Sequence, residues 1–172
     1  AHINESFAHA VHDFRIFLDY LESEGVSKVG VTGISLGGYT SALLASVEER
    51  LEFAIPNVPV VSLADLVLEW FPVNLSIKAM LKATGTSIRD IRHELAVHSA
   101  LTYQPRLPRE RLMVIAGAGD RLAPPKHARL LWDHWDRPRI HWFPGNHLVH
   151  LDKGKYLKEM ARFMKDIEFD RM

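Results

Sequence analysis

The sequence predicts an α/β fold in which a parallel sheet of about four strands is flanked by helices. Short apolar, β-branched stretches typical of buried strands alternate with helical patterns, and the first of these stretches is Val29 to Thr32. A strand, a helix and a second strand in succession favour parallel pairing through a crossover connection. The length of 172 residues and an apolar fraction of 47% suit one domain with a substantial core.

The elements can be placed in order along the chain. Apolar residues from Phe7 to Leu21 recur at steps of four, three, four and three, which predicts an amphipathic helix that stops at Gly25. A strand over 28–32, a helix from 37 to about 48 and a short strand around 53–55 follow. The pattern of strands resumes with a strand over 111–116, a helix over 125–135, a strand over 139–143 and a closing helix over 156–167.

Between residues 62 and 101 the pattern changes to short helical stretches, which are interrupted by Pro72 and Gly85. We expect a helical insertion here within a single domain over 1–172. Its larger apolar residues are candidates either for lining a substrate pocket or for packing the insertion onto the sheet: Trp70, Phe71, Leu75, Met80 and Leu81.

Composition excludes several classes of function. Lys plus Arg and Asp plus Glu both number 21, so no net charge favours a nucleic acid partner. The absence of cysteine excludes disulfides, zinc-thiolate sites and a cysteine nucleophile. No apolar run approaches the roughly 18 residues of a membrane span, and no basic segment followed by an apolar stretch opens the chain. We therefore expect no membrane span and take the cytoplasm as the default compartment.

The most specific motif is Gly33-Ile34-Ser35-Leu36-Gly37, which reads G-x-S-x-G between a predicted strand and a predicted helix. A sharp turn at this place holds a serine clear of the backbone in a strained conformation, where its hydroxyl can attack a carbonyl carbon. We expect the glycines at minus two and plus two to leave room for the close approach of strand and helix.

A serine nucleophile needs a histidine to take its proton and a carboxylate to orient that histidine. In open α/β sheets such groups collect beyond the carboxyl ends of the strands. Asp120 follows the strand over 111–116, and His147 follows the strand over 139–143. A capping role for Asp120 and simple surface exposure for His147 are the alternatives, and His150 is a rival base. The order Ser, Asp, His is the one expected with a G-x-S-x-G turn.

These motifs resemble the α/β-hydrolase family, and residues 1–172 are similar to the second half of its fold. The resemblance is carried by 33–37, by Gly117-Ala118-Gly119-Asp120 with Pro124, by Gly145-Asn146-His147 and by 99–103. It implies that Ser35 is the nucleophile, His147 the general base and acid, and Asp120 its orienting carboxylate. It further implies that the backbone N–H of Leu36 is one oxyanion donor and that 62–101 is a cap over the substrate pocket.

The resemblance also makes Asp65 a rival for the carboxylate, since some members place it after the strand that follows the nucleophile. The other histidines are weaker candidates. We expect His93 and His98 at the surface or facing substrate, and we place His9, His12, His127 and His134 on helices.

The resemblance does not extend to the N-terminal strands of the family's fold. Ser35 comes too early for the strands that precede the nucleophile in this family, one of which leads to the loop with the second oxyanion donor. We expect either a piece of a longer protein, or a second chain or protomer that completes the sheet, or a reduced domain with another role.

The function expected is hydrolysis of a small-molecule carboxylic ester through an acyl-enzyme, with no metal or cofactor required. Three alternatives stay open: an amidase or peptidase of the prolyl-oligopeptidase-like branch, an acyltransferase, and an inactive interaction module. Neither the natural substrate nor the acyl length follows from the sequence.

Overall fold

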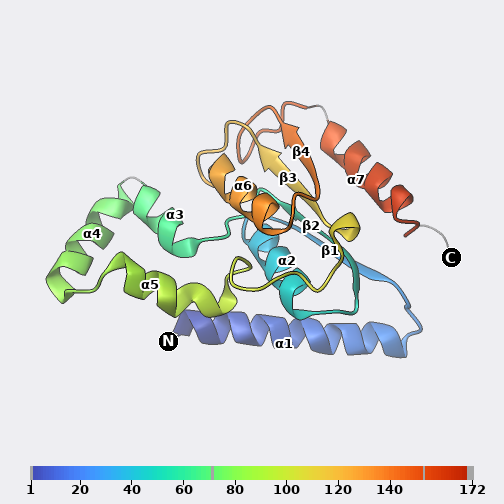
Figure 1. Cartoon of the computed structure of the whole chain (residues 1–172), viewed down its shortest axis with the longest axis horizontal. Helices are drawn as coiled ribbons and strands as arrows, with labels where there is room; N and C mark the ends of the chain where they lie inside the picture. Colours follow the sequence, from blue (N-terminus) through green and yellow to red (C-terminus); the bar gives the residue numbers. More distant parts are fainter. Residues whose placement is uncertain (1, 71, 153, 170–172) are drawn as a thin grey trace.

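The computed structural model describes residues 2–70, 72–152 and 154–169. Its centre is a parallel sheet with the strand order β1-β2-β3-β4. The strands are β1 (Val29–Ile34), β2 (Leu51–Asn57), β3 (Met113–Gly117) and β4 (Arg139–Phe143) (Figure 1). The predicted α/β class and the four predicted strands are confirmed, and β1 and β2 extend beyond their expected ends.

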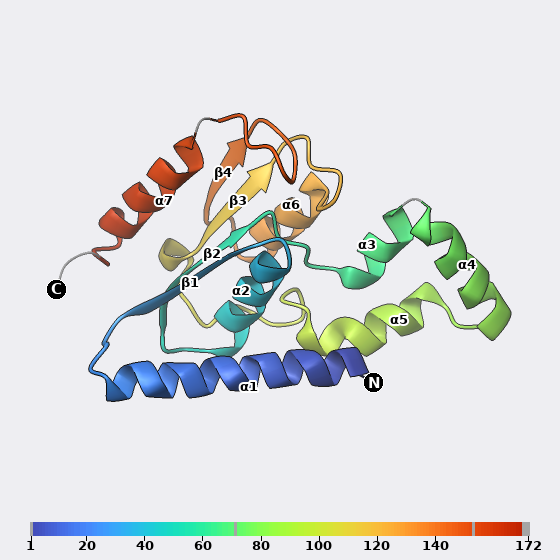
Figure 2. The same cartoon turned by 180° about the vertical axis from the view of Figure 1, so that it is seen from behind.

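Helices cover both faces of the sheet. The helices α1 (His2–Ser23), α2 (Leu36–Val47) and α6 (Pro125–His134) pack on one face, and α7 (Lys155–Asp166) packs on the other (Figure 1, Figure 2). Alternate residues of each strand point to opposite faces, so β3 contributes Val114 to the first core and Ile115 to the second. Both residues are fully buried, which explains why the strand sequences are almost continuously apolar.

The segment between β2 and β3 is helical and extends away from the sheet as an arm (Figure 1, Figure 2). It contains α3 (Leu63–Glu69), α4 (Val73–Thr84), α5 (Ile88–Leu95) and a 3-10 turn, η1 (Ala96–His98). Gly85 ends α4 in the left-handed conformation with a φ of 69°, and Ser87 forms a capping box with Asp90 that starts α5. The side-chain amide of Asn4 donates to the Glu94 carbonyl at 3.0 Å, which joins the arm to the start of α1.

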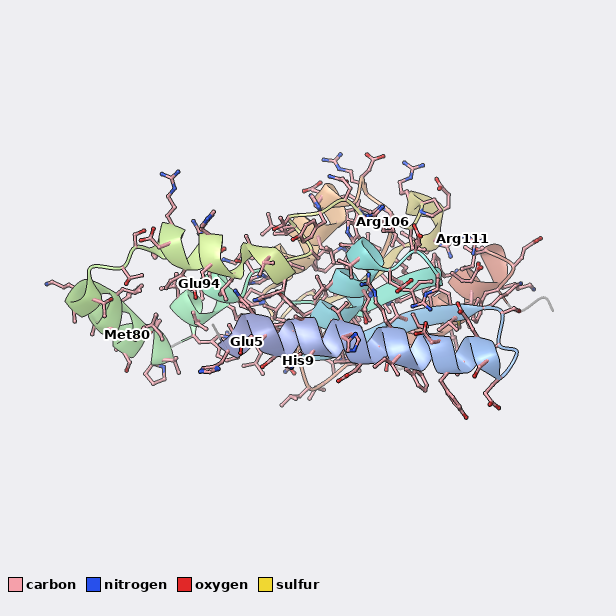
Figure 3. All side chains as sticks on the ribbon, turned by 90° about the horizontal axis from the view of Figure 1, so that it is seen from below. Glu5, His9, Met80, Glu94, Arg106 and Arg111 are labelled. Carbon is pink, nitrogen blue, oxygen red and sulfur yellow. The ribbon has the colours of Figure 1, made fainter. Side chains whose placement is uncertain are left out.

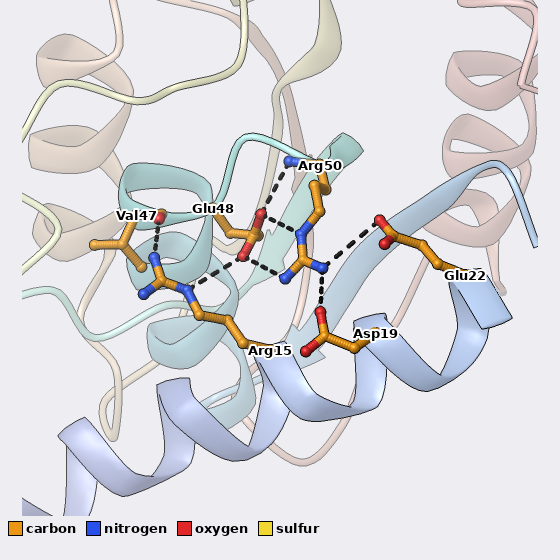
Figure 4. A network of polar contacts seen from close by, with 6 residues as sticks. All are labelled: Arg15, Asp19, Glu22, Val47, Glu48 and Arg50. Atoms are coloured by element: carbon orange, nitrogen blue, oxygen red, sulfur yellow. Dashed lines mark hydrogen bonds and ion pairs between the residues drawn. The ribbon is translucent and has the colours of Figure 1, made fainter.

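A network of charges fixes α1 against the turn between α2 and β2 (Figure 4). Glu48, whose side chain is only 5% exposed, accepts hydrogen bonds from Arg50 Nε at 2.9 Å and Arg15 Nε at 3.3 Å. Arg50 Nη1 also donates to Asp19 of α1 at 2.6 Å. The hydrogen bonds from Arg50, acting against burial, lower the pKa of Glu48 to about 2.

Both edge strands of the sheet, β1 and β4, have one neighbour each among the described residues, and one side of α1 is exposed. Among the described residues β1 pairs with β2 alone, and its side chains are only partly buried, in contrast to those of β2 and β3. On α1, Ile16, Phe17 and Tyr20 are 53%, 53% and 55% exposed. No described helix, α1 included, is both long and apolar enough to cross a membrane.

Candidate active site

Ser35 occupies the sharp turn between β1 and α2. Its backbone has a φ of 58° and a ψ of −112°, a conformation that residues other than glycine rarely adopt. The turn is held from both sides, because the Ser35 N–H donates to the Asn57 carbonyl at 3.0 Å and the Ser35 carbonyl accepts from the Tyr39 N–H at 2.9 Å. This strain is what the G-x-S-x-G motif predicts.

Of the two glycines that the motif places around Ser35, the structure requires Gly33 but not Gly37. A Cβ on Gly33 would lie 2.4 Å from the Gly37 carbonyl oxygen, so the glycine at minus two is required as predicted. A Cβ on Gly37 would meet nothing within 4 Å, whereas one on Gly38 would lie 2.6 Å from the Asn57 carbonyl oxygen. The space between helix and strand that we assigned to Gly37 is needed at Gly38, because Gly38 is the residue of α2 that faces β2.

Asp120 and His147 meet beyond the ends of β3 and β4. His147 Nδ1 lies 2.7 Å from Asp120 Oδ2, and because a carboxylate only accepts, Nδ1 carries the proton. Asp120 Oδ1 accepts from the backbone N–H groups of Leu122 and Ala123, both at 2.8 Å. Asp120 therefore caps its own turn and also accepts a hydrogen bond from the histidine. Its side chain is fully buried, and that of His147 is 13% exposed.

The loop that carries His147 is ordered by its own hydrogen bonds. Asn146 Oδ1 accepts from the backbone N–H groups of Leu148 and Val149 at 3.0 and 2.9 Å. Gly145 has a φ of 129°, and its carbonyl accepts from the Gly119 N–H at 2.9 Å. This last bond joins the loop of Asp120 directly to the loop of His147.

Ser35 and His147 line one apolar pocket of about 310 Å³. Among the described residues no hydrogen bond joins their side chains, and the pocket lies between them. The other lining residues are Leu36, Tyr39, Val60, Leu63, Leu66, Trp70 and Leu122.

Of the apolar candidates in the arm that the structure describes, only Trp70 lines this pocket. Leu75 and Met80 are more than half exposed on α4, and Figure 3 shows Met80 at the outer end of the arm. Leu81 is buried elsewhere on α4, and Phe71 lies outside the described residues.

The rival residues have other partners. Asp65 accepts from Arg92 Nε at 3.1 Å and from the Ser62 hydroxyl at 2.6 Å. Although burial opposes it, these hydrogen bonds hold the pKa of Asp65 below its usual value. The His150 ring stacks on Phe143, with ring centroids 4.0 Å apart. Neither rival takes part in the contact between Asp120 and His147.

His98 is buried, which corrects the expectation that it lies at the surface or faces substrate. It is 4% exposed and packs on the Phe7 ring, with centroids 4.4 Å apart. The Tyr39 hydroxyl donates to the His98 carbonyl at 2.8 Å, so the contact between this hydroxyl and His98 Nδ1 has the histidine as donor. Burial raises the pKa of Tyr39 and lowers that of His98.

This buried pair fixes the end of the arm to α2, the helix that begins after Ser35. Sequence reasoning missed Tyr39, and its place one helical turn after Ser35 is the signal that could have found it. Of the remaining histidines, His9, His12, His127 and His134 lie on helices as predicted, and His127 is fully buried. In the part of the chain that the structure describes, no cluster of three or more His, Asp or Glu side chains could hold a metal ion.

Comparison with known proteins identifies the fold. Residues 8–71 match the family model of alpha/beta hydrolase domain containing 18. Two uncharacterized proteins of Mycobacterium tuberculosis, Rv2627c of strain H37Rv and MT2702 of strain CDC 1551, are each 37% identical to the chain over 142 residues. The match covers 81% of this chain and 33% of each relative, so the chain spans about a third of the curated relatives it matches.

Solved structures agree with the family match. A puromycin-hydrolyzing peptidase of M. tuberculosis aligns with a TM-score of 0.68 and 14% identity, over 90% of this chain and 25% of the peptidase. The Pyrococcus furiosus esterase Pf2001 aligns with a TM-score of 0.63 and 13% identity, over 91% of this chain and 61% of the esterase. MGS-MChE2, an alpha/beta hydrolase from a lagoon sediment metagenome, aligns with a TM-score of 0.58 and 17% identity, over 92% of this chain and 71% of that enzyme.

The chain has the α/β-hydrolase fold. The four parallel strands, their helices and the likeness to these structures establish it.

Proposed function

We propose that this chain carries the catalytic residues of a serine hydrolase that cleaves carboxylic esters through an acyl-enzyme. The observation that carries the proposal is that Ser35 and His147 line one pocket while His147 is hydrogen-bonded to the buried Asp120. A nucleophile, a base and an orienting carboxylate in this relation form the arrangement that activates a serine.

In the proposed reaction His147 Nε2 takes the proton of the Ser35 hydroxyl as its oxygen attacks the ester carbonyl. Asp120 stabilises the imidazolium and keeps Nδ1 protonated, because the carboxylate can only accept. Leu36 is the first residue of α2, so its N–H has no partner within the helix and is available to the oxyanion. His147 then protonates the departing alcohol, and water activated by the same histidine releases the acid.

The pocket favours an apolar acyl group. Apart from Ser35 and His147 its lining side chains are aliphatic or aromatic, and it has no carboxylate to bind a cationic substrate. Leu66 lies on α3 and Trp70 directly follows it, and both line the pocket, so we assign the arm over 62–101 the role of a cap on the acyl side.

A second oxyanion donor would come from outside the described residues. We propose that a further strand pairs with the exposed edge of β1, and that the segment carrying this strand also covers Ile16, Phe17 and Tyr20 of α1. Another part of a longer protein, a second chain or another protomer could provide that strand. One missing donor lowers the rate about 10²- to 10³-fold, so we expect weak activity from residues 1–172 alone.

Cleavage of an amide is the second candidate, because a solved structure of similar fold is a puromycin-hydrolyzing peptidase. Both reactions use the same residues and differ in leaving group and pocket shape.

The test compares turnover of p-nitrophenyl acyl esters with that of proline p-nitroanilides. We expect the esters to be cleaved faster and the activity to disappear in Ser35→Ala and His147→Ala. Faster cleavage of the anilides would transfer the proposal to a peptidase, and esterase activity retained in Ser35→Ala would overturn it.

A further inference from the structure

Two pockets meet at His147. The apolar pocket holds Ser35 on its wall, and a second, open pocket of about 510 Å³ adjoins it. Leu122 and His147 line both pockets, whereas Ser35 lines only the first. The histidine therefore stands between two spaces that a single substrate could occupy at once.

The two spaces differ in chemistry. The second pocket is lined by Gly119, Arg121, Leu122, Asn146, His147 and Leu148. An arginine and an asparagine therefore line the same space as the histidine, in contrast to the aliphatic and aromatic wall of the first. A substrate that spans both has one apolar part and one polar part.

The reaction decides which part lies where. The acyl carbon must reach Ser35, so the acyl chain occupies the pocket that Ser35 lines. The departing alcohol receives its proton from His147, so it leaves on the histidine's side. The second pocket is the space on that side that does not contain Ser35.

Arg121 is free to bind a ligand. Within the part of the chain that the structure describes, its side chain makes no hydrogen bond, ion pair or cation–π contact, whereas Arg92 and Arg139 each lie beside a carboxylate. The neighbouring Asp120 does not neutralise it, because both oxygens of Asp120 are taken by His147 and two backbone N–H groups.

Asn146 lines the same pocket. Its Oδ1 is occupied by two backbone N–H groups, which fixes the orientation of the amide. Its Nδ2 has no partner among the described residues, and this atom can only donate. A guanidinium and an amide N–H together suit an anionic oxygen group.

We propose that Arg121 and Asn146 form a subsite for an anionic leaving group, and that the substrate is an ester of an apolar acid with an alcohol that carries a carboxylate or a phosphate. This inference rests on the proposed function at Ser35. A charge-assisted contact of this kind in an open pocket gives a preference of about tenfold over a neutral alcohol.

The experiment uses matched esters of one acyl chain, hexanoate, with 4-nitrophenol and with 5-hydroxy-2-nitrobenzoate, and a third ester with glycerol phosphate. Binding of each intact ester is measured calorimetrically with the Ser35→Ala variant, so that the measurement does not depend on turnover. The same measurements are made with three double variants, in which Arg121→Gln, Arg121→Lys or Arg109→Gln is combined with Ser35→Ala. Arg109 precedes β3, so it lies at the opposite end of that strand from Asp120 and serves as the matched control.

We expect both anionic esters to bind about tenfold more tightly than the neutral ester. We expect Arg121→Gln to remove this preference, Arg121→Lys to keep part of it, and Arg109→Gln to leave it unchanged. The relative affinity of the carboxylate and the phosphate identifies the natural anion. Equal binding of neutral and anionic esters, absence of binding, or a preference that survives in Arg121→Gln would overturn the subsite.

Turnover by the unsubstituted protein separates the two proposals. Hydrolysis of the neutral ester without an anionic preference would leave the proposed function intact and refute the subsite. An anionic preference in binding without hydrolysis of any ester would support the subsite and count against the hydrolase.

Discussion

The exchange Asp120→Asn tests the proposed chemistry without disturbing the fold. Asp120 accepts three hydrogen bonds, two from the backbone N–H groups of Leu122 and Ala123 and one from His147. In the asparagine variant the amide oxygen can keep the two backbone donors, which turns the NH₂ group toward His147. His147 Nδ1 must then accept, so the proton moves to Nε2 and the histidine can no longer take the proton of Ser35.

The size of the effect follows from this change of tautomer. The corresponding exchange in a Ser-His-Asp triad lowers turnover about 10⁴-fold. The free energy of unfolding should change by less than about 1 kcal/mol, because the backbone donors keep an acceptor. Asp120→Ala is the matched comparison: it leaves the buried Ala123 N–H and the Leu122 N–H without an acceptor, at a cost of about 2–3 kcal/mol in stability.

The assay is the rate of labelling by a fluorophosphonate probe, measured with the midpoint of urea unfolding for each variant. We expect Asp120→Asn to be stable and almost unreactive, and Asp120→Ala to be both unstable and unreactive. An asparagine variant that labels at the rate of the unsubstituted protein would refute the assigned role of Asp120.

Three further predictions concern stability. Glu48→Gln should lower the free energy of unfolding by about 3 kcal/mol at neutral pH. The pKa of Glu48 falls from 4.5 for an unperturbed side chain to about 2 in the folded protein, and each pKa unit is worth about 1.4 kcal/mol. The native protein should lose this contribution as the pH falls from about 5 toward 2, and acid titrations of urea midpoints check both points. Gly38→Ala should cost about 1–3 kcal/mol, because the new Cβ would overlap the Asn57 carbonyl; an unchanged thermal midpoint would contradict this. His127 is fully buried, and burial lowers its pKa. The unfolded state therefore binds the proton more readily, and stability should fall as the pH drops below about 6.5, with a weaker dependence in His127→Phe.

The sequence was sufficient for the elements because each carries its own local pattern. The residues of α1 and of α7 repeat with helical spacing, and the strands are short apolar stretches between turns. The position of Ser35 was also a local prediction, since the glycine at 33 and the strand before it belong to one motif. Asp120 and His147 could be chosen because the ends of neighbouring parallel strands meet at one edge of the sheet.

Contacts between distant segments were beyond sequence reasoning. His98 was expected near the surface or substrate, because nothing in its neighbourhood of the sequence shows that Phe7 and Tyr39 enclose it. The need for glycine at 38 rather than 37 depends on which side of α2 faces Asn57. Trp70 was one of five apolar candidates in the arm, and its place at the pocket depends on how α3 packs.

The central proposal is that Ser35 is an activated nucleophile, and the most direct test is to find the residue that a fluorophosphonate probe modifies. The protein is incubated with the probe, its intact mass is measured, and the adduct is mapped by peptide sequencing, with Ser35→Ala and His147→Ala in parallel. We predict a single adduct on Ser35, none in Ser35→Ala and strongly slowed labelling in His147→Ala. An adduct on another residue, or equal labelling before and after Ser35→Ala, would contradict the proposal.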